Sequence, residues 1–276
     1  MKKNWTQDTV TITDGIELFY TRTGNGNKKT LVLAHGITDH GLCWHQFAAD
    51  LEDDYDLIMY DAYGHGKSSR IDPEKRFDLA ENLHDLIKAL ELDQPGVIGH
   101  SMGAATAAKF TAKYPELVST LVLEDPPWTD QEMSKQQKTD RLQEWKKNIL
   151  ATKKKSVKEL VRQKRKEAPK WEEAILEEWA QAKLLFDPAF FDHYPLDHSD
   201  WRELAKSIKI PTLIVTGDNE LGAIVTPELG VEAVKLLEKG EFGHISAAGH
   251  CVRHEQYQPY LTMVRLFLKR NLPSQA

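Results

Sequence analysis

The sequence predicts an α/β fold in which a mostly parallel sheet carries helices on both faces. Continuous apolar runs alternate with helical patterns along most of the 276 residues. A glycine-flanked serine, in VIGHSMGAAT at 97–106, joins one apolar run directly to a helical pattern. Residues 128–207 contain no strand-like run, and they carry five of the seven tryptophans. We therefore expect one α/β core that is interrupted by a helical insertion.

The core elements follow one another in order. A hairpin is expected first, with strands at 9–13 and 18–21 and a turn at Asp14-Gly15. The later runs are continuously apolar, as in strands that are buried on both faces of a parallel sheet. They lie at 31–34, 57–60, 97–98, 120–123 and 212–216, and a sixth strand is expected at 241–246. Helical patterns separate them at 44–52, 77–92, 102–113 and 231–239. This alternation favours helices on both faces of the sheet.

The stretch 128–207 interrupts this rhythm. It is helical in pattern, and prolines mark its boundaries at Pro126-Pro127 and at Pro211. We expect residues 1–127 and 208–276 to form the core, and residues 128–207 to form a helical cap over whatever the core presents.

Composition limits the partners of the protein. A formal net charge of -6 gives no overall reason to bind nucleic acid or an anionic membrane. Cys43 and Cys251 are too few for a disulfide framework, which favours a reducing compartment. The start MKKNWTQDTV lacks the apolar segment of a signal peptide, and no run approaches the ~18 apolar residues of a membrane span. We expect a soluble cytoplasmic protein that acts on a small molecule.

A basic segment at 146–166 is the exception to this charge balance. It has ten lysines and arginines and a single acidic residue, Glu159. Such a face could meet an anionic surface or nucleic acid. We favour the solvated side of a cap helix, because the acidic residues at 172–173 and 177–178 balance it.

The serine of VIGHSMGAAT is the candidate nucleophile. Residues 97–98 form the apolar run, and Ser101 stands at the tip of an abrupt turn into the next helix. Gly99 and Gly103 leave room where side chains would collide, and the strained turn exposes the serine to a substrate and a base. A serine hydroxyl needs such a base, because it is a poor nucleophile at neutral pH.

Four motifs in order resemble the α/β-hydrolase family with a helical cap. His35-Gly36 follows the first parallel strand, and DAYGHGKS at 61–68 follows the second. GHSMG at 99–103 follows the third strand, and Gly249-His250 follows the last. The resemblance spans essentially the whole chain, and it implies the α/β-hydrolase fold and acyl-transfer chemistry on Ser101.

The resemblance also implies roles for other residues. The family's order places the catalytic base at His250, after the last strand. It places the oxyanion donors at the backbone N–H groups of Ile37 and Met102. No cluster of His, Cys, Asp and Glu has metal-ligand spacing, so we expect neither metal nor cofactor.

The carboxylate that orients the base has three candidates. In the commoner location, after the strand at 212–216, the usual position holds Glu220, with Asp218 nearby. The other location is the end of the strand at 120–123, and the layout there resembles that of haloalkane dehalogenases and zearalenone-type lactonases. When the sequences are aligned on the serine turn, Asp125 falls at the position of their acid. We place Asp125 slightly ahead of Asp218, and Glu220 third.

These features predict a serine hydrolase that cleaves a carboxylic ester or lactone through an acyl-enzyme. The tryptophan-rich cap favours a bulky cyclic ester, such as a macrolide macrolactone. The alternatives are a C–C bond hydrolase, a thioesterase, or a hydrolase-derived binding protein without turnover. His35, Trp44 and Trp128 are the expected pocket residues, although Trp44 would equally serve to anchor its helix in the core.

Overall fold

An eight-stranded sheet runs through the computed structural model, which describes residues 5–194 and 200–272. The strands are β1 (Thr6–Thr11), β2 (Glu17–Arg22), β3 (Thr30–Ala34), β4 (Asp56–Tyr60), β5 (Gly96–His100), β6 (Thr120–Glu124), β7 (Pro211–Thr216) and β8 (Lys239–His244). Their order across the sheet is β1-β2-β4-β3-β5-β6-β7-β8. β1 pairs antiparallel with β2, and β2 pairs antiparallel with β4. The remaining pairs, from β4 through β3 to β8 in the order of the sheet, are parallel. The parallel strands therefore end at one edge of the sheet, where loops gather side chains for a site.

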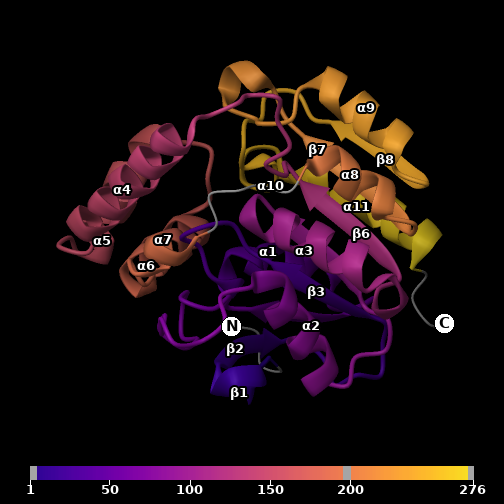
Figure 1. The fold of residues 1–276 in the computed structure, drawn as a ribbon, viewed down its shortest axis with the longest axis horizontal. Coiled ribbons are helices and arrows are strands. Elements are labelled where there is room, and N and C mark those ends of the chain that lie inside the picture. The colour runs from indigo at the N-terminus through magenta and orange to yellow at the C-terminus, as the bar shows by residue number, and fades with distance from the viewer. Residues whose placement is uncertain (1–4, 195–199, 273–276) are drawn as a thin grey trace.

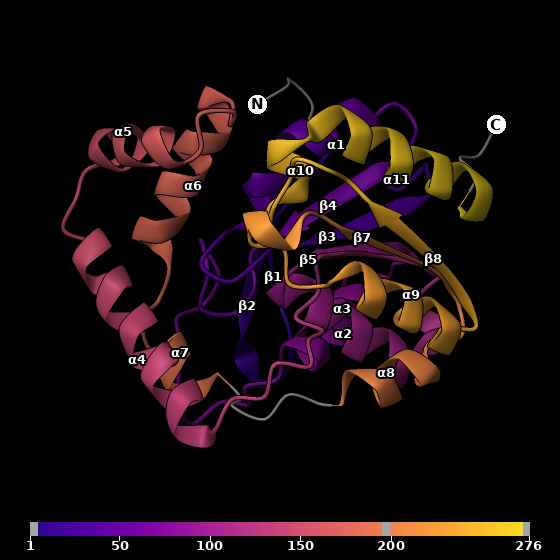
Figure 2. The same ribbon diagram turned by 90° about the horizontal axis from the view of Figure 1, so that it is seen from above.

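Helices cover both faces of this sheet (Figure 1, Figure 2). They are α1 (His45–Leu51), α2 (Leu79–Ala89), α3 (Met102–Lys113), α9 (Pro227–Leu236), α10 (Val252–Glu255) and α11 (Tyr257–Asn271). Alternate residues of β3 enter different cores, as the pleat of a strand requires. Leu31 and Leu33 pack with α1 and α11, whereas Val32 and Ala34 pack with α2 and α3. This arrangement confirms the predicted α/β class with helices on both faces.

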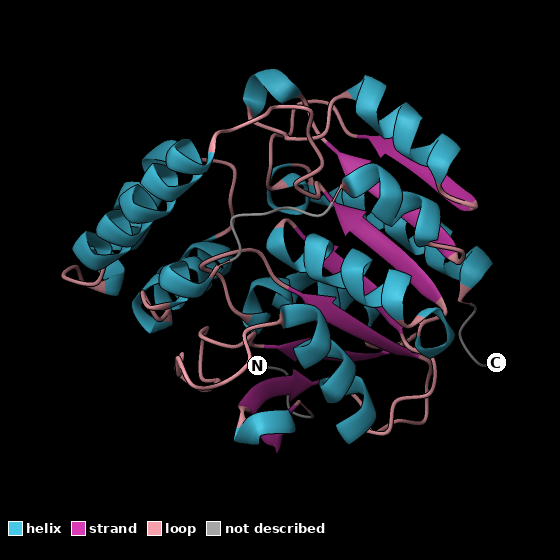
Figure 3. Ribbon diagram, viewed as in Figure 1, coloured by secondary structure: helices cyan, strands magenta, loops and turns pink. Residues whose placement is uncertain are grey.

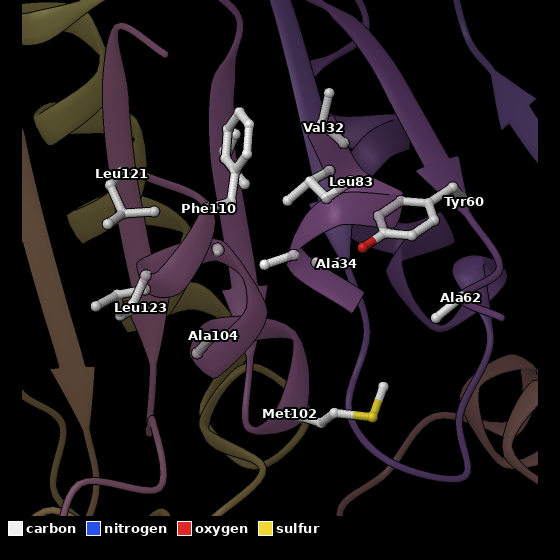
Figure 4. Close-up of a cluster of buried hydrophobic side chains, with 14 of the residues drawn as sticks. Val32, Ala34, Tyr60, Ala62, Leu83, Met102, Ala104, Phe110, Leu121 and Leu123 are labelled. Carbon is white, nitrogen blue, oxygen red and sulfur yellow. The ribbon is translucent and has the colours of Figure 1, made fainter. Parts of the chain in front are cut away.

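The core beneath α3 shows why its sequence is rich in alanine. Ala104, Ala107 and Ala108 are completely buried, so the helix backbone lies close to the sheet. Figure 4 shows Phe110 of α3 among Leu121 and Leu123 of β6. Small residues at the start of α3 and a large aromatic residue near its end pack together in this layer.

The helix predicted at 231–239 begins earlier than expected. In the structure α9 spans Pro227–Leu236. Thr226 caps its first turn by accepting the N–H of Leu229, and Pro227 suits the first helical position because no N–H is needed there. β8 starts at Lys239, which leaves no room for the helix to continue. The prediction missed the proline as a start signal.

The segment between β6 and β7 is helical, as predicted. Its helices are α4 (Lys135–Thr152), α5 (Val157–Glu167), α6 (Glu173–Leu185), α7 (Phe190–His193) and α8 (Trp201–Ser207). Ser134 and Ser156 each form a capping box, which fixes the starts of α4 and α5. α4 to α7 lie together to one side of the core, whereas α8 packs against α3 and α9 (Figure 3). The division at 128–207 stays a prediction, and α8 lies on the core layer.

Two stacked tryptophans join the two ends of this helical segment. The rings of Trp128 and Trp201 lie 5.5 Å apart at 16°. Beside them, Arg202 forms ion pairs with Asp130 and Glu232. Trp128 and Trp201 are both buried, so they act as packing residues where the chain leaves and re-enters the core.

None of the helices in residues 5–194 and 200–272 is sufficiently long and apolar to cross a bilayer.

Candidate active site

The serine turn has the conformation that its glycines predict. β5 ends at His100, Ser101 adopts φ 52° and ψ -114°, and α3 begins at Met102. This backbone conformation is strained for a residue with a side chain. A methyl group on Gly99 would overlap the backbone of Gly103, and one on Gly103 would overlap the carbonyl of Ala34. Both glycines are therefore needed to pack a sharp strand-to-helix turn against β3.

The imidazole of His250 contacts the carboxylate of Asp125. Nδ1 of His250 lies 2.6 Å from Oδ2 of Asp125, which is completely buried, while the His250 side chain is 32% exposed. With Nδ1 donating to this carboxylate, Nε2 carries the lone pair and can accept a proton. His250 also lies beside the serine turn, because Nε2 of His100 is 3.0 Å from the His250 carbonyl oxygen.

The carboxylate of Asp125 is held from several sides. The N–H of Ile224 donates to both of its oxygens, and the N–H of Val225 and the hydroxyl of Thr216 donate to Oδ1. These donors come from the end of β7 and the loop after it, the other expected location of the acid. That loop thus supplies hydrogen bonds to Asp125. A carboxylate with this many donors keeps one orientation.

Asp218 has a different partner. Its Oδ1 lies 2.8 Å from Nε2 of His244, and its Oδ2 accepts the N–H of Ala247. This N–H, helped by His244, lowers the pKa of Asp218. Asp218 therefore stabilises the segment that follows β8, through His244 and Ala247. Glu220 lies on an exposed turn after Asp218.

The loop after β3 passes close to the serine turn. A side chain on Gly36 would collide with the ring of His100 and would come within 3.6 Å of the Cβ of Ser101. Of the described residues, none accepts a hydrogen bond from the N–H of Ile37. Met102 is the first residue of α3, so its N–H has no partner in a preceding turn. The two expected oxyanion donors therefore remain available.

Two buried histidines shape this loop. His35 binds the carbonyl of Gly36 through Nδ1 and accepts the N–H of Ala62 at Nε2. Nε2 of His65 accepts the N–H of Thr38, next to Ile37. Burial lowers the pKa of both His35 and His65, so each stays neutral and accepts at Nε2. These contacts make His35 a scaffold residue, and its expected place in the pocket stays a prediction.

Trp44 and Trp128 also have core contacts. Trp44 is completely buried, packs edge-on against Phe47, and lies 3.8 Å beneath the guanidinium of Arg253. This fits the helix anchor that we considered for Trp44. Trp128 stacks on Trp201 with only 2% of its surface exposed. Their places in a substrate pocket stay predictions.

A buried ion pair beside the site was missed by the sequence analysis. Nη1 of Arg253 lies 2.7 Å from Oε2 of Glu124, and the Arg253 N–H donates to Oε1. Glu124 directly precedes Asp125, and Arg253 follows His250 by three positions. The pair thus ties the two chain segments that carry the His250–Asp125 contact. The sequence feature that could have indicated this pair is Glu124, because a charged residue at the end of a buried strand requires a partner.

Removing Arg253 is expected to cost about 3–5 kcal/mol of unfolding free energy, since Arg253→Met leaves the Glu124 carboxylate buried without its partner. Urea denaturation followed by circular dichroism measures this. The matched control is Arg270→Met, which removes an exposed ion pair with Glu241 and is expected to cost less than about 1 kcal/mol. Equal losses in the two variants would show that the buried pair does not stabilise the fold.

Comparison with known proteins identifies the family. Residues 29–256 match the family model described as the alpha/beta hydrolase fold. The chain belongs to the α/β-hydrolase fold family. This confirms the resemblance that the four motifs indicated, and the sheet and the serine turn are those of this fold.

Curated relatives match part of the chain. A putative 2-succinyl-6-hydroxy-2,4-cyclohexadiene-1-carboxylate synthase of Bacillus subtilis is 33% identical over 118 residues, 42% of this chain and 43% of that protein. The lipase LipV of Mycobacterium tuberculosis is 33% identical over 114 residues, 40% of this chain and 42% of its own length. An uncharacterized protein of the same species is 31% identical over 101 residues, 36% of this chain and 29% of that protein. The matches therefore span less than half of each relative.

Solved structures match nearly the whole α/β-hydrolase chain. A thioesterase domain from the curacin biosynthetic pathway has a TM-score of 0.75 at 20% identity, covering 95% of this chain and 99% of that one. An esterase from Exiguobacterium antarcticum has a TM-score of 0.76 at 18% identity, covering 96% of this chain and 100% of that one. At such low identity these likenesses show the fold alone.

Proposed function

We propose that the protein is a serine hydrolase that cleaves carboxylic esters or lactones through an acyl-enzyme on Ser101. The observation that carries the proposal is the contact of His250 with the buried Asp125 beside the strained serine turn. An imidazole that is oriented by a carboxylate, next to a serine at a strand-to-helix turn, is the arrangement that activates a hydroxyl.

The reaction follows from this arrangement. Oγ of Ser101 attacks the carbonyl carbon while Nε2 of His250 takes its proton, and the N–H groups of Ile37 and Met102 stabilise the oxyanion. The C–O bond to the alcohol breaks, and His250 returns the proton to that oxygen. Water then cleaves the acyl-enzyme by the same steps. An ester yields an acid and an alcohol, and a lactone yields one hydroxy acid.

We propose further that the preferred substrate is a bulky cyclic ester of the macrolactone type. Of the five tryptophans in the helical segment, Trp128, Trp171 and Trp201 are buried in packing. Trp179 of α6 is half-buried, and it packs in the same apolar cluster as Cys251, the neighbour of His250. Its indole would supply apolar surface next to the base, where a large ring would lie.

A substrate panel tests both parts of the proposal. We expect macrolactones, such as zearalenone and a 16-membered macrolide, to have a higher kcat/KM than p-nitrophenyl acetate or a long-chain ester. Trp179→Ala is expected to lower kcat/KM for the macrolactones about tenfold more than for p-nitrophenyl acetate, because only a large ring would reach the indole. The comparison with p-nitrophenyl acetate corrects for the lost contact between this ring and the ammonium of Lys183, which lies 5.1 Å from the ring centroid. Trp145→Ala is the control, because this tryptophan is exposed on α4 and packs beside Phe191 of α7 rather than in the cluster that holds Cys251.

Other outcomes of the panel distinguish the alternatives. Faster cleavage of small acyclic esters than of every macrolactone, with Trp179→Ala affecting both alike, would contradict the bulky-lactone proposal. A thioester or a C–C diketone turned over far faster than any ester would move the activity to those reactions. Saturable binding of a ligand without serine-dependent turnover would indicate a binding protein.

Both cysteines, Cys43 and Cys251, are free thiols. This supports the proposal that the protein works in a reducing compartment such as the cytoplasm.

A further inference from the structure

A lysine of the helical segment reaches the loop that carries the expected oxyanion donor. Nζ of Lys183, near the end of α6, lies 3.0 Å from the carbonyl oxygen of Thr38 and 3.0 Å from Oδ1 of Asp39. The side chains of Lys183 and Asp39 are only 11% and 15% exposed. A lysine is rarely buried to this extent unless it has partners. Both of its partners lie within two residues of Ile37.

This contact is strongly electrostatic. Burial alone would raise the pKa of the Asp39 carboxyl, but the charge of Lys183 and its hydrogen bond outweigh burial and hold that pKa well below the usual range. The Asp39 carboxyl is therefore ionised at neutral pH. Removal of Lys183 would leave a largely buried carboxylate without its partner, so the loop would have to move to hydrate it.

The loop itself has little freedom to adjust. Thr38 adopts φ 63°, its N–H is held by His65, and the Asp39 N–H donates to the carbonyl of Gly36. Ile37 lies inside this tight turn. Because the Asp39 N–H bond to Gly36 closes this turn around Ile37, we expect a shift of Thr38 or Asp39 to change the direction of the Ile37 N–H.

α6 and the residue before it make further polar contacts with the same part of the core. Oε2 of Glu178 lies 3.0 Å from Nε2 of His40, a close approach without hydrogen-bond geometry. Glu172 accepts a hydrogen bond from Gln46. With Lys183, these contacts attach α6 to the chain between residues 38 and 46.

We propose that Lys183 is a positioning residue that couples the docking of α6 to the oxyanion loop. Resting on the proposed function, the inference is that Lys183 fixes the Ile37 N–H in the direction needed to stabilise the oxyanion. The helical segment therefore contributes to the transition state as well as to substrate binding.

Kinetics of Lys183→Met on p-nitrophenyl acetate test the catalytic consequence. Because a misdirected oxyanion donor acts on the transition state, we expect kcat to fall by about 10–100-fold while KM changes less than about threefold. Lys183→Arg, which keeps the charge and donors, is expected to restore most of kcat. The matched control is Lys146→Met, which breaks an ion pair between α4 and α7 and should leave kcat unchanged. An unchanged kcat in Lys183→Met would overturn the proposal.

Hydrogen exchange provides a readout that does not depend on activity. We expect the amides of residues 36–42 to exchange about tenfold faster or more in Lys183→Met than in wild type, and Lys146→Met to leave them unchanged. Unchanged exchange would overturn the proposal even if kcat fell. If the wild type hydrolysed no ester, the proposed function would fail, and unchanged or faster exchange would still decide whether Lys183 holds the loop. Asp39→Asn, which removes the charge of the partner, replaces Lys183→Met if that variant does not fold.

Discussion

Asparagine in place of Asp125 is expected to lower kcat by about 10⁴. The substitution keeps the shape of the buried side chain but removes the negative charge that meets Nδ1 of His250 at 2.6 Å. An amide in this position favours the wrong tautomer of the imidazole, so Nε2 can no longer accept the proton of Ser101. The measurement is kcat with a chromogenic ester, with thermal unfolding as the check on folding.

Asp218→Asn is the matched control for this prediction. Asp218 binds His244 and the N–H of Ala247, so its loss is expected to leave kcat within about tenfold of wild type. The reverse ranking of the two variants would move the acid to the loop after β7. Small and equal effects would point to Glu220.

The second large effect is expected at the nucleophile and its base. Ser101→Ala and His250→Ala should each lower kcat on the order of 10⁴–10⁶, because each removes a group that forms or breaks bonds to the substrate. The two losses should not add in the double variant, since the residues act as a unit. Each variant should unfold near the wild-type temperature, because neither side chain is part of the buried core. Ester hydrolysis that survives Ser101→Ala would contradict the proposed mechanism.

The core strands could be predicted from the sequence because burial on both faces leaves a continuous apolar run. The strand at 120–123 and the helix at 102–113 agree with β6 and α3 almost residue for residue. The start of α9 was missed because its signal is a capping threonine and a proline, and neither contributes to apolar periodicity.

The acid could not be decided from the sequence, because both candidate loops end at the same edge of a parallel sheet. Which carboxylate orients the base depends on which one contacts His250, and His250 and Asp125 are 125 positions apart in the chain. The structure shows that the loop after β7 turns its N–H groups of Ile224 and Val225 toward Asp125. Every residue except proline has a backbone N–H, so the residue types of this loop do not indicate that it donates to Asp125.

The two buried ion pairs were beyond prediction for a related reason. Neither the residue types nor the sequence neighbours of Arg253 and Lys183 indicate burial, and their partners Glu124 and Asp39 are distant in the sequence. A charged residue shows only that a partner is needed, and the fold determines which residue it is.

Covalent labelling by a fluorophosphonate probe tests the central claim most directly. A base-activated serine attacks the phosphorus centre and displaces fluoride, so the probe marks the activated hydroxyl whatever the natural substrate is. Peptide mapping by mass spectrometry should find one adduct, on Ser101, and labelling should be abolished in Ser101→Ala and strongly slowed in His250→Ala. Undiminished labelling of Ser101→Ala, or an adduct on another residue of the wild type, would contradict the assignment of Ser101 as the nucleophile.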